Sequence, residues 1–289
     1  MIDLHTHSTY SDGSLTPLQL ADLARREGLC ALALTDHDTT DGLPSFLDAC
    51  ASGGSEPLRA VPGVEISVDV PRGTMHVLGY FIRSGEPRLE ALLERIRGGR
   101  DCRNGMIINR LRELGMPLNE DEVARLAGGD VVGRPHIAQA MVARGYVRTT
   151  SAAFDRFLAK GQPAYCDRYH PSPQEGIAAI NAAGGVAVLA HPWTLDMTAS
   201  RLRTFLGDLR SAGLAGIETW YPEHSAEQQQ QYLRLCEEFG LVAAGGSDFH
   251  GAMNPAIRLG RGFSGLGVPD TAVDELAARA ASAGRAVAL

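Results

Sequence analysis

The chain opens with Ile2-Asp3-Leu4-His5-Thr6-His7, residues 2–7, a partly apolar run that ends in two histidines. We interpret this run as a β-strand. Side chains two positions apart on a strand point to the same face, so His5 and His7 should face the same way. Imidazole is a ligand of borderline divalent metals, which makes the end of this strand a candidate metal site.

Histidines and carboxylates recur after later strand-like runs. They lie in Ser11-Asp12-Gly13, Thr35-Asp36-His37-Asp38, Gly63-Val64-Glu65, Met75-His76-Val77, Ala190-His191-Pro192 and Ser247-Asp248-Phe249-His250. With the first pair, nine candidate ligands exceed what a single ion needs. The sequence therefore predicts a multinuclear metallohydrolase.

Composition narrows the possible partners and compartments. The 289 residues carry a formal net charge of −7 and show no obvious basic face, which favours a small anionic substrate over duplex DNA. The 5 cysteines form no Cys-x-x-Cys pair, so we expect a reducing cytoplasm rather than disulfides or a thiolate zinc site. No apolar run is long enough for a membrane span, and the N-terminus lacks the pattern of a signal peptide.

Residues 1–82 alternate short apolar runs with amphipathic segments. The pattern predicts strands at 2–7, 30–35, 58–65 and 75–82, and helices at 17–27 and 43–51. Thr16 and Pro17 would supply the N-cap and the first-turn proline of the first helix, and Gly28 would end it.

Strand signals are absent between residues 85 and 162. Helices are predicted at 88–114, 119–126, 134–144 and 150–158. Within the first of these, the run Arg100–Arg103 is predicted to be a solvated helix face. This stretch should therefore be a helical insertion into an α/β domain.

The alternation of strands and helices resumes at Ser172. Helices are predicted at 172–183, 199–212, 226–240 and 270–283, and strands at 186–190, 214–219 and 241–246. Such a rhythm predicts a parallel sheet. Because candidate ligands follow at least five strands, a barrel is favoured over an open sheet, in which fewer strands meet at one crevice.

Taken together and in this order, the histidine and carboxylate motifs resemble the polymerase and histidinol phosphatase (PHP) family. The resemblance covers nearly the whole chain and rests on Asp3–His7, Thr35–Asp38, Gly63–Glu65, Ala190–Pro192 and Ser247–His250. It implies an α/β fold, a distorted (β/α)7 TIM-like barrel built from residues 1–84 and 163–289. Residues 85–162 would form a helical insertion that caps the active site.

The resemblance also implies three divalent metal ions, with manganese as the first choice and zinc or iron as alternatives. The first ion would be held by His5, His7, Glu65 and Asp248. Glu65 would bridge to a second ion, which His76 and His191 would also hold. The third ion would be held by Asp12, His37 and His250.

The insertion points to one subgroup of the family. Gly133–Ile137, Ala164-Tyr165 and the segment Ile217–His224 resemble enzymes that act on nucleoside 3′,5′-bisphosphates. This implies a phosphoesterase that removes the 3′-phosphate, converting adenosine 3′,5′-bisphosphate to AMP, and that also degrades short, single-stranded 5′-phosphorylated RNA in the 5′→3′ direction. Histidinol-phosphate phosphatase and a DNA-polymerase-type PHP exonuclease remain as alternatives.

The expected mechanism is hydrolysis by a hydroxide that bridges the metal ions. Asp248, His191 and His224 are the candidate catalytic residues, and Arg134 and His136 are candidates to bind a substrate phosphate, with Arg134 suited to a bidentate contact. His224 would either bind the same phosphate or protonate the leaving oxygen.

Two further carboxylates, Asp36 and Asp38, flank His37. They would either orient metal ligands or serve as turn and N-cap residues.

Overall fold

The computed structural model describes residues 1–52, 58–127, 132–263 and 265–282. The chain divides into two compact units. The barrel unit comprises Met1–Leu93 and Pro171–Leu289, and the helical unit comprises Glu94–His170.

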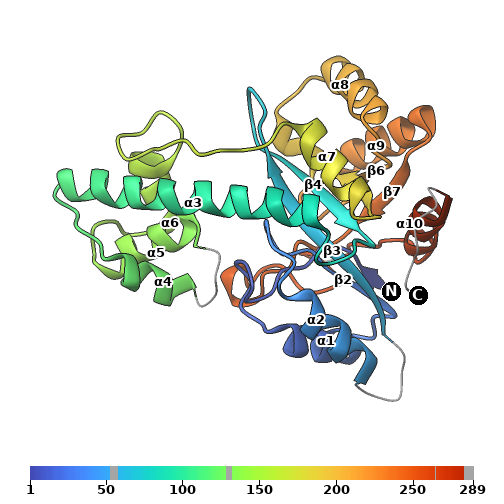
Figure 1. The fold of residues 1–289 in the computed structure, drawn as a ribbon, viewed down its shortest axis with the longest axis horizontal. Coiled ribbons are helices and arrows are strands. Elements are labelled where there is room, and N and C mark those ends of the chain that lie inside the picture. The colour runs from blue at the N-terminus through green and yellow to red at the C-terminus, as the bar shows by residue number, and fades with distance from the viewer. Residues whose placement is uncertain (53–57, 128–131, 264, 283–289) are drawn as a thin grey trace. The chain divides into compact units, whose positions relative to one another are not determined.

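One seven-stranded sheet forms the centre of the barrel unit (Figure 1). Its strands follow one another in chain order: β1 Ile2–Asp3, β2 Ala31–Leu34, β3 Arg59–Val68, β4 Met75–Tyr80, β5 Val186–Leu189, β6 Gly216–Trp220 and β7 Val242–Gly245. Beyond β1 and β7, a parallel bridge joins Thr6 to Phe249 and brings the last strand back beside the first. The predicted α/β fold with a seven-stranded barrel is thus confirmed.

The fourth strand does not run in the direction that the sequence pattern predicted. β4 pairs antiparallel with both β3 and β5, whereas the other neighbouring pairs are parallel. The prediction of a wholly parallel sheet was therefore wrong. Only residues 69–74 connect β3 to β4, and such a short hairpin can join only antiparallel strands. As a result, His76 near the start of β4 lies at the same end of the sheet as the carboxyl ends of its neighbours.

Helices follow most strands of the barrel unit. They are α1 Pro17–Arg26, α2 Leu43–Ser52, α7 Pro173–Ala182, α8 Ala199–Ser211, α9 Ala226–Phe239 and α10 Thr271–Ser282. The predicted start of the first helix is confirmed, since Thr16 and Gln19 form a reciprocal capping box followed by Pro17. The expected end of the last helix at residue 283 lies outside the described residues.

The interior of the barrel unit is a continuous apolar cluster. It includes Ile2, Leu4, Val61, Tyr80 and Val188, all of which are almost fully buried. The helix α10 packs Leu276 into the same cluster. This core fixes the strands, and the strand ends in turn position the polar side chains described below.

The helical unit has a separate core. The long helix α3, Pro87–Glu113, runs into it from the barrel unit and is followed by α4 Glu120–Ala127, α5 Arg134–Ala143, α6 Thr150–Ala153 and the π-helical turn η1 Phe154–Leu158. Ile107, Leu111, Ile137 and Met141 are buried together there. Among the described residues of either unit, no helix is long and apolar enough to span a membrane.

Candidate metal centre

All nine predicted ligands converge at one end of the barrel. His5 and His7 follow β1, His37 follows β2, Glu65 lies on β3 and His76 on β4. His191 follows β5, and Asp248 and His250 follow β7, while Asp12 lies on the loop before α1. β6 is the one strand of the sheet that contributes none of the nine.

One oxygen of the buried Glu65 carboxylate faces three imidazoles. Oε2 lies 3.2 Å from Nε2 of His5, 3.2 Å from Nε2 of His7 and 3.0 Å from Nδ1 of His37. The expectation that His5 and His7 face the same way is confirmed, since both rings point to Glu65, although β1 ends at Asp3, earlier than predicted.

The other oxygen of Glu65 faces two further imidazoles. Oε1 lies 2.8 Å from Nδ1 of His76 and 3.0 Å from Nε2 of His191. Both oxygens of Glu65 are therefore engaged, on opposite sides, with nitrogen atoms that can act as metal ligands.

Asp248 joins the group around His5 and His7. Its Oδ1 lies 3.3 Å from Nε2 of His5 and 3.1 Å from Nε2 of His7. Its Oδ2 accepts a hydrogen bond of 2.9 Å from the hydroxyl of Tyr221. Asp248 has a φ of 55°, a strained conformation for a residue other than glycine.

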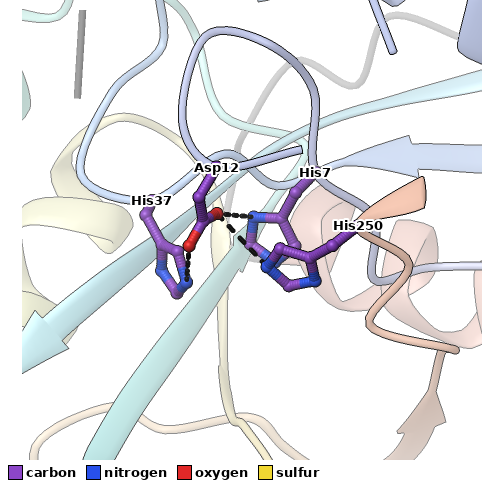
Figure 2. A group of neighbouring side chains, drawn as sticks. All are labelled: His7, Asp12, His37 and His250. Atoms are coloured by element: carbon purple, nitrogen blue, oxygen red, sulfur yellow. Dashed lines mark ion pairs between the residues drawn. The ribbon is translucent and has the colours of Figure 1, made fainter. Parts of the chain in front are cut away.

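Figure 2 shows a second group, in which three imidazoles point toward the carboxylate of Asp12. Its oxygens lie 3.2 Å from Nε2 of His250, 3.8 Å from Nε2 of His37 and 3.8 Å from Nδ1 of His7. His7 and His37 thus each present one ring nitrogen to Asp12 and the other to Glu65.

Three sets of ligand atoms are compact enough to hold an ion, with all atoms of a set within 4.8 Å of one another. The sets are His5, His7, Glu65 and Asp248; His37, Glu65 and His76; and His7, Asp12, His37 and His250. The first set has the same members as the first group implied by the resemblance. The other two sets differ from the groups that the resemblance implies. His37 belongs to both of them, and His7 joins the set around Asp12. His191 contacts Glu65 but belongs to none of the three sets.

The polar atoms at the centre lack hydrogen-bond partners, which is the feature that fits a metal. The unpartnered buried atoms are Nε2 of His5, Nε2 of His7, Nδ1 of His37, Oδ1 of Asp12, Oε2 of Glu65 and Oδ1 of Asp248. A buried polar atom without a partner is costly. Five of these atoms lie around Oε2 of Glu65 and Oδ1 of Asp248, and Oδ1 of Asp12 faces Nε2 of His250 and Nδ1 of His7. Nitrogen and carboxylate oxygen atoms in this arrangement suit divalent metal ions.

The protonation of the side chains at the centre depends on the contacts between carboxylates and imidazoles. Burial would raise the pKa of Glu65, but the imidazoles of His37, His5 and His76 outweigh it and hold the pKa well below its usual range. Burial would likewise lower the pKa of His7, yet Asp248 and Glu65 raise it to about 10. Without metal the carboxylates therefore hold a proton on the imidazole of His7, and a bound divalent ion would displace that proton.

The carboxylates that flank His37 hold the surrounding loops. Asp36 accepts hydrogen bonds from Ser8 N–H at 2.7 Å and from the hydroxyls of Ser8 and Ser11, both at 2.6 Å. Asp38 accepts from Ser67 N–H at 2.8 Å and from its hydroxyl at 3.0 Å. Asp36 thereby fixes the loop that leads to Asp12, and Asp38 fixes β3 two residues beyond Glu65.

His224 lies close to the end of β6 and is 7% exposed. Its Nδ1 lies 2.9 Å from the carbonyl oxygen of Thr219, so Nδ1 carries the proton and donates it to that carbonyl. Nε2 is then the only ring nitrogen available for chemistry. The ring packs between the rings of Tyr221 and Tyr232, at centroid distances of 5.1 and 4.9 Å.

The predicted phosphate-binding residues lie at the start of α5 in the helical unit. His136 is buried, and its Nδ1 accepts a hydrogen bond of 3.0 Å from Gly133 N–H, which caps the helix. Arg134 is half-buried, and its Nη1 lies 3.3 Å from the carbonyl oxygen of Leu158.

The prediction that Arg100–Arg103 is a solvated helix face was wrong for both arginines, which are 9% and 4% exposed. Burial and the nearby Arg168, Arg134 and Arg100 lower the pKa of Arg103 to about 9. The helical unit therefore contains a cluster of four neighbouring arginines, which we call the arginine cluster: Arg100, Arg103, Arg134 and Arg168.

Two residues that contact the proposed ligands were missed by the sequence reasoning, Glu218 and Tyr221. Both come from the β6 segment, which was noted only for its resemblance to a subgroup. A fully buried carboxylate next to Ile217 in a short apolar strand was a usable signal, because buried carboxylates need specific partners.

Comparison with known proteins places these features in a family. Residues 3–128 match the family model of the PHP domain. The chain is 35% identical over 257 residues to a 3′,5′-nucleoside bisphosphate phosphatase of Chromobacterium violaceum, covering 86% of this chain and 87% of that protein. It is also 35% identical over 248 residues to a 5′-3′ exoribonuclease of Haemophilus influenzae, covering 86% of this chain and 89% of that protein.

A solved structure agrees with the sequence relatives. A protein of Bifidobacterium adolescentis, assigned as a metal-dependent phosphoesterase, superposes with a TM-score of 0.84 at 31% identity and covers 96% of both chains. Similarity of this extent, together with the convergent ligand set, shows that the chain belongs to the PHP family of metal-dependent phosphoesterases, hydrolases that act on phosphate esters.

Proposed function

We propose that this phosphoesterase removes the 3′-phosphate from nucleoside 3′,5′-bisphosphates and also degrades short 5′-phosphorylated RNA. The observation that carries the proposal is the set of buried, unpartnered imidazole and carboxylate atoms that face one another at the barrel end. The activities of the two sequence relatives, a bisphosphate phosphatase and an exoribonuclease, support a nucleotide as substrate.

The proposed cofactor is a set of three divalent ions, manganese first and zinc or iron as alternatives. Glu65, with one oxygen toward His5 and His7 and the other toward His76 and His191, would bridge two of them. Asp12, His37 and His250 would hold the third. When bound, such ions supply a water of lowered pKa and neutralise the charge of phosphoryl oxygens.

The protein side chains have separate roles in the proposed reaction. Asp248 and His191 present ligand atoms at the edge of the centre and keep the phosphoryl group oriented. His224 exchanges the proton through Nε2, since its Nδ1 is committed to Thr219. Burial lowers the pKa of His224, so the imidazole is neutral alone and becomes a general acid when a substrate phosphate stabilises its charged form.

The arginine cluster of the helical unit is a candidate place for a phosphate to bind. Like charges in a buried place repel one another, and a bound phosphate relieves that repulsion through charge-assisted hydrogen bonds. We propose that Arg134 with Arg100 and Arg103 binds a substrate phosphate, and that His136 supports Arg134 by capping the same helix.

The two alternative functions differ in the substrate that they require. Histidinol phosphate carries one phosphate and a cationic amine, which arginines would repel. A proofreading exonuclease must accept long DNA, whereas the protein carries a net charge of −7.

The test is phosphate release by the manganese-loaded protein from adenosine 3′,5′-bisphosphate, AMP and histidinol phosphate, with a 5′-phosphorylated RNA trimer followed by chromatography. We expect selective turnover of the bisphosphate, with slower shortening of the trimer. Turnover of histidinol phosphate alone would contradict the proposal, and so would equal turnover of AMP and the bisphosphate.

A further inference from the structure

The strand β6 contributes no predicted ligand, yet it lies between β5 and β7, which both do. Glu218 is the inward-facing residue of this strand, and its side chain is 0% exposed. In the barrel unit, a carboxylate this deeply buried needs defined partners. The two carboxylate oxygens of Glu218 have different hydrogen-bond partners, and each partner belongs to a proposed metal ligand.

The first partner is the ring of His5. Oε1 of Glu218 lies 2.9 Å from Nδ1 of His5, while Nε2 of the same ring faces Glu65 and Asp248 at 3.2 and 3.3 Å. A carboxylate can only accept, so the hydrogen of a neutral His5 resides on Nδ1. The lone pair of Nε2 is then directed at the centre, which is the tautomer that a metal ion requires.

The second partner is the backbone of His191. Oε2 of Glu218 accepts a hydrogen bond of 2.7 Å from His191 N–H. His191 has a φ of 24°, a region that residues other than glycine rarely adopt. Such a conformation persists only when its surroundings hold it in place. The hydrogen bond that His191 N–H donates to Glu218 helps to hold this conformation, in which Nε2 of His191 lies 3.0 Å from Oε1 of Glu65.

We propose that Glu218 is a positioning residue of the metal centre, which sets the tautomer of His5 and holds the strained backbone of His191. Tyr221, just after β6, acts in the same way on the other neighbouring strand, because its hydroxyl donates to Oδ2 of Asp248 and leaves Oδ1 for the metal. The strand without ligands therefore orients ligands from three other strand ends. This inference rests on the proposed ligands and not on the proposed substrate.

The test compares metal affinity and thermal stability of metal-free and manganese-loaded protein for Glu218→Gln and Tyr221→Phe. Free manganese is buffered, bound metal is measured by elemental analysis, and melting is followed by calorimetry. For Glu218→Gln we expect metal affinity to fall roughly 10- to 100-fold, as for other residues that orient metal ligands. The gap between the metal-free and the manganese-loaded melting temperatures should narrow relative to the wild type, because weaker metal binding adds less stability.

Asp3→Asn is the matched control. Asp3 is an equally buried carboxylate that accepts from the backbone N–H groups of His5, Ser247 and Gly260 and from the Ser247 hydroxyl, and no imidazole of the described residues donates to it. It should lower the metal-free and metal-loaded melting temperatures alike.

The inference would be overturned if Glu218→Gln behaved as this control does, with both forms destabilised and metal affinity unchanged. Tyr221→Phe removes only one hydroxyl, so it serves as a second test if Glu218→Gln does not fold. In that case, a metal affinity of Tyr221→Phe equal to that of the wild type would overturn the inference. If manganese did not stabilise the wild-type protein, the proposed metal centre itself would be contradicted. That outcome is distinguishable from the two variant results above.

Discussion

Nε2 of His191 lies 3.0 Å from Oε1 of Glu65, although the two residues are 126 positions apart in the chain. β4, which carries His76, lies between their strands in the sheet and supplies the other nitrogen on that oxygen. Because Oε2 faces a different set of imidazoles, both oxygens of this one carboxylate are committed to the centre. Glu65 is therefore the residue on which the arrangement depends most.

Replacement of Glu65 by glutamine should remove the bridge between two ion sites. The amide keeps the size of the side chain but loses its charge and one acceptor oxygen, so metal affinity should fall by at least about 100-fold, beyond the effect of residues that only orient ligands. Metal content by elemental analysis is the measurement, with Glu113→Gln on the exposed end of α3 as control. Full metal content in Glu65→Gln would show that Glu65 is not a ligand.

Removal of metal should destabilise the protein. The centre buries carboxylate and imidazole atoms that have no other partners, so an ion that binds only the folded state adds about 4 kcal/mol when its concentration is 1,000 times its dissociation constant. A chelator should therefore lower the melting temperature by roughly 5–10 °C. Calorimetry with and without EDTA checks this, and superimposable melting curves would rule out a metal in the folded core.

Loss of an arginine from the helical unit should affect substrate binding and spare the metal. Each of Arg103→Ala and Arg134→Ala removes charge-assisted hydrogen bonds worth about 1.5–3 kcal/mol, which corresponds to a rise in KM of roughly 10- to 100-fold for the bisphosphate. Steady-state kinetics with parallel metal analysis is the measurement, and Arg112→Ala at an exposed position is the control. Loss of metal in either variant would show that the assigned role is wrong.

His224→Asn should slow the reaction according to the leaving group. If Nε2 of His224 protonates the leaving oxygen, kcat for a nucleotide should fall by about 10²- to 10⁴-fold. A phosphate ester with a good leaving group, such as p-nitrophenyl phosphate, needs no such proton and should lose far less. Equal losses for the two substrates would assign His224 to binding or to structure.

The sequence was sufficient to predict the fold class and the convergence of the ligands. His5 and His7, and later His191 and Asp248, follow apolar runs, and the ends of parallel strands meet at one face of a barrel. The direction of β4 was not predicted, because the pattern of an apolar run is the same for either direction. Only the short connection between β3 and β4 decides it.

The surroundings of the site were harder to predict than the convergence of its candidate ligands. The burial of Arg100 and Arg103 depends on which helices pack against α3, and an isolated helix pattern holds no information on that. Glu218 was overlooked because its function depends on two contacts with residues far away in the chain, at His5 and at His191. Such contacts arise from the fold, so the sequence shows only a carboxylate within an apolar run and not the partners that it binds.

The most direct test of the proposed function is the identity of the products from adenosine 3′,5′-bisphosphate, before and after metal removal. The manganese-loaded protein should release one phosphate and leave AMP, and EDTA treatment should abolish the reaction until manganese is restored. Formation of adenosine 3′-monophosphate instead, or phosphate release that persists without metal, would contradict the account.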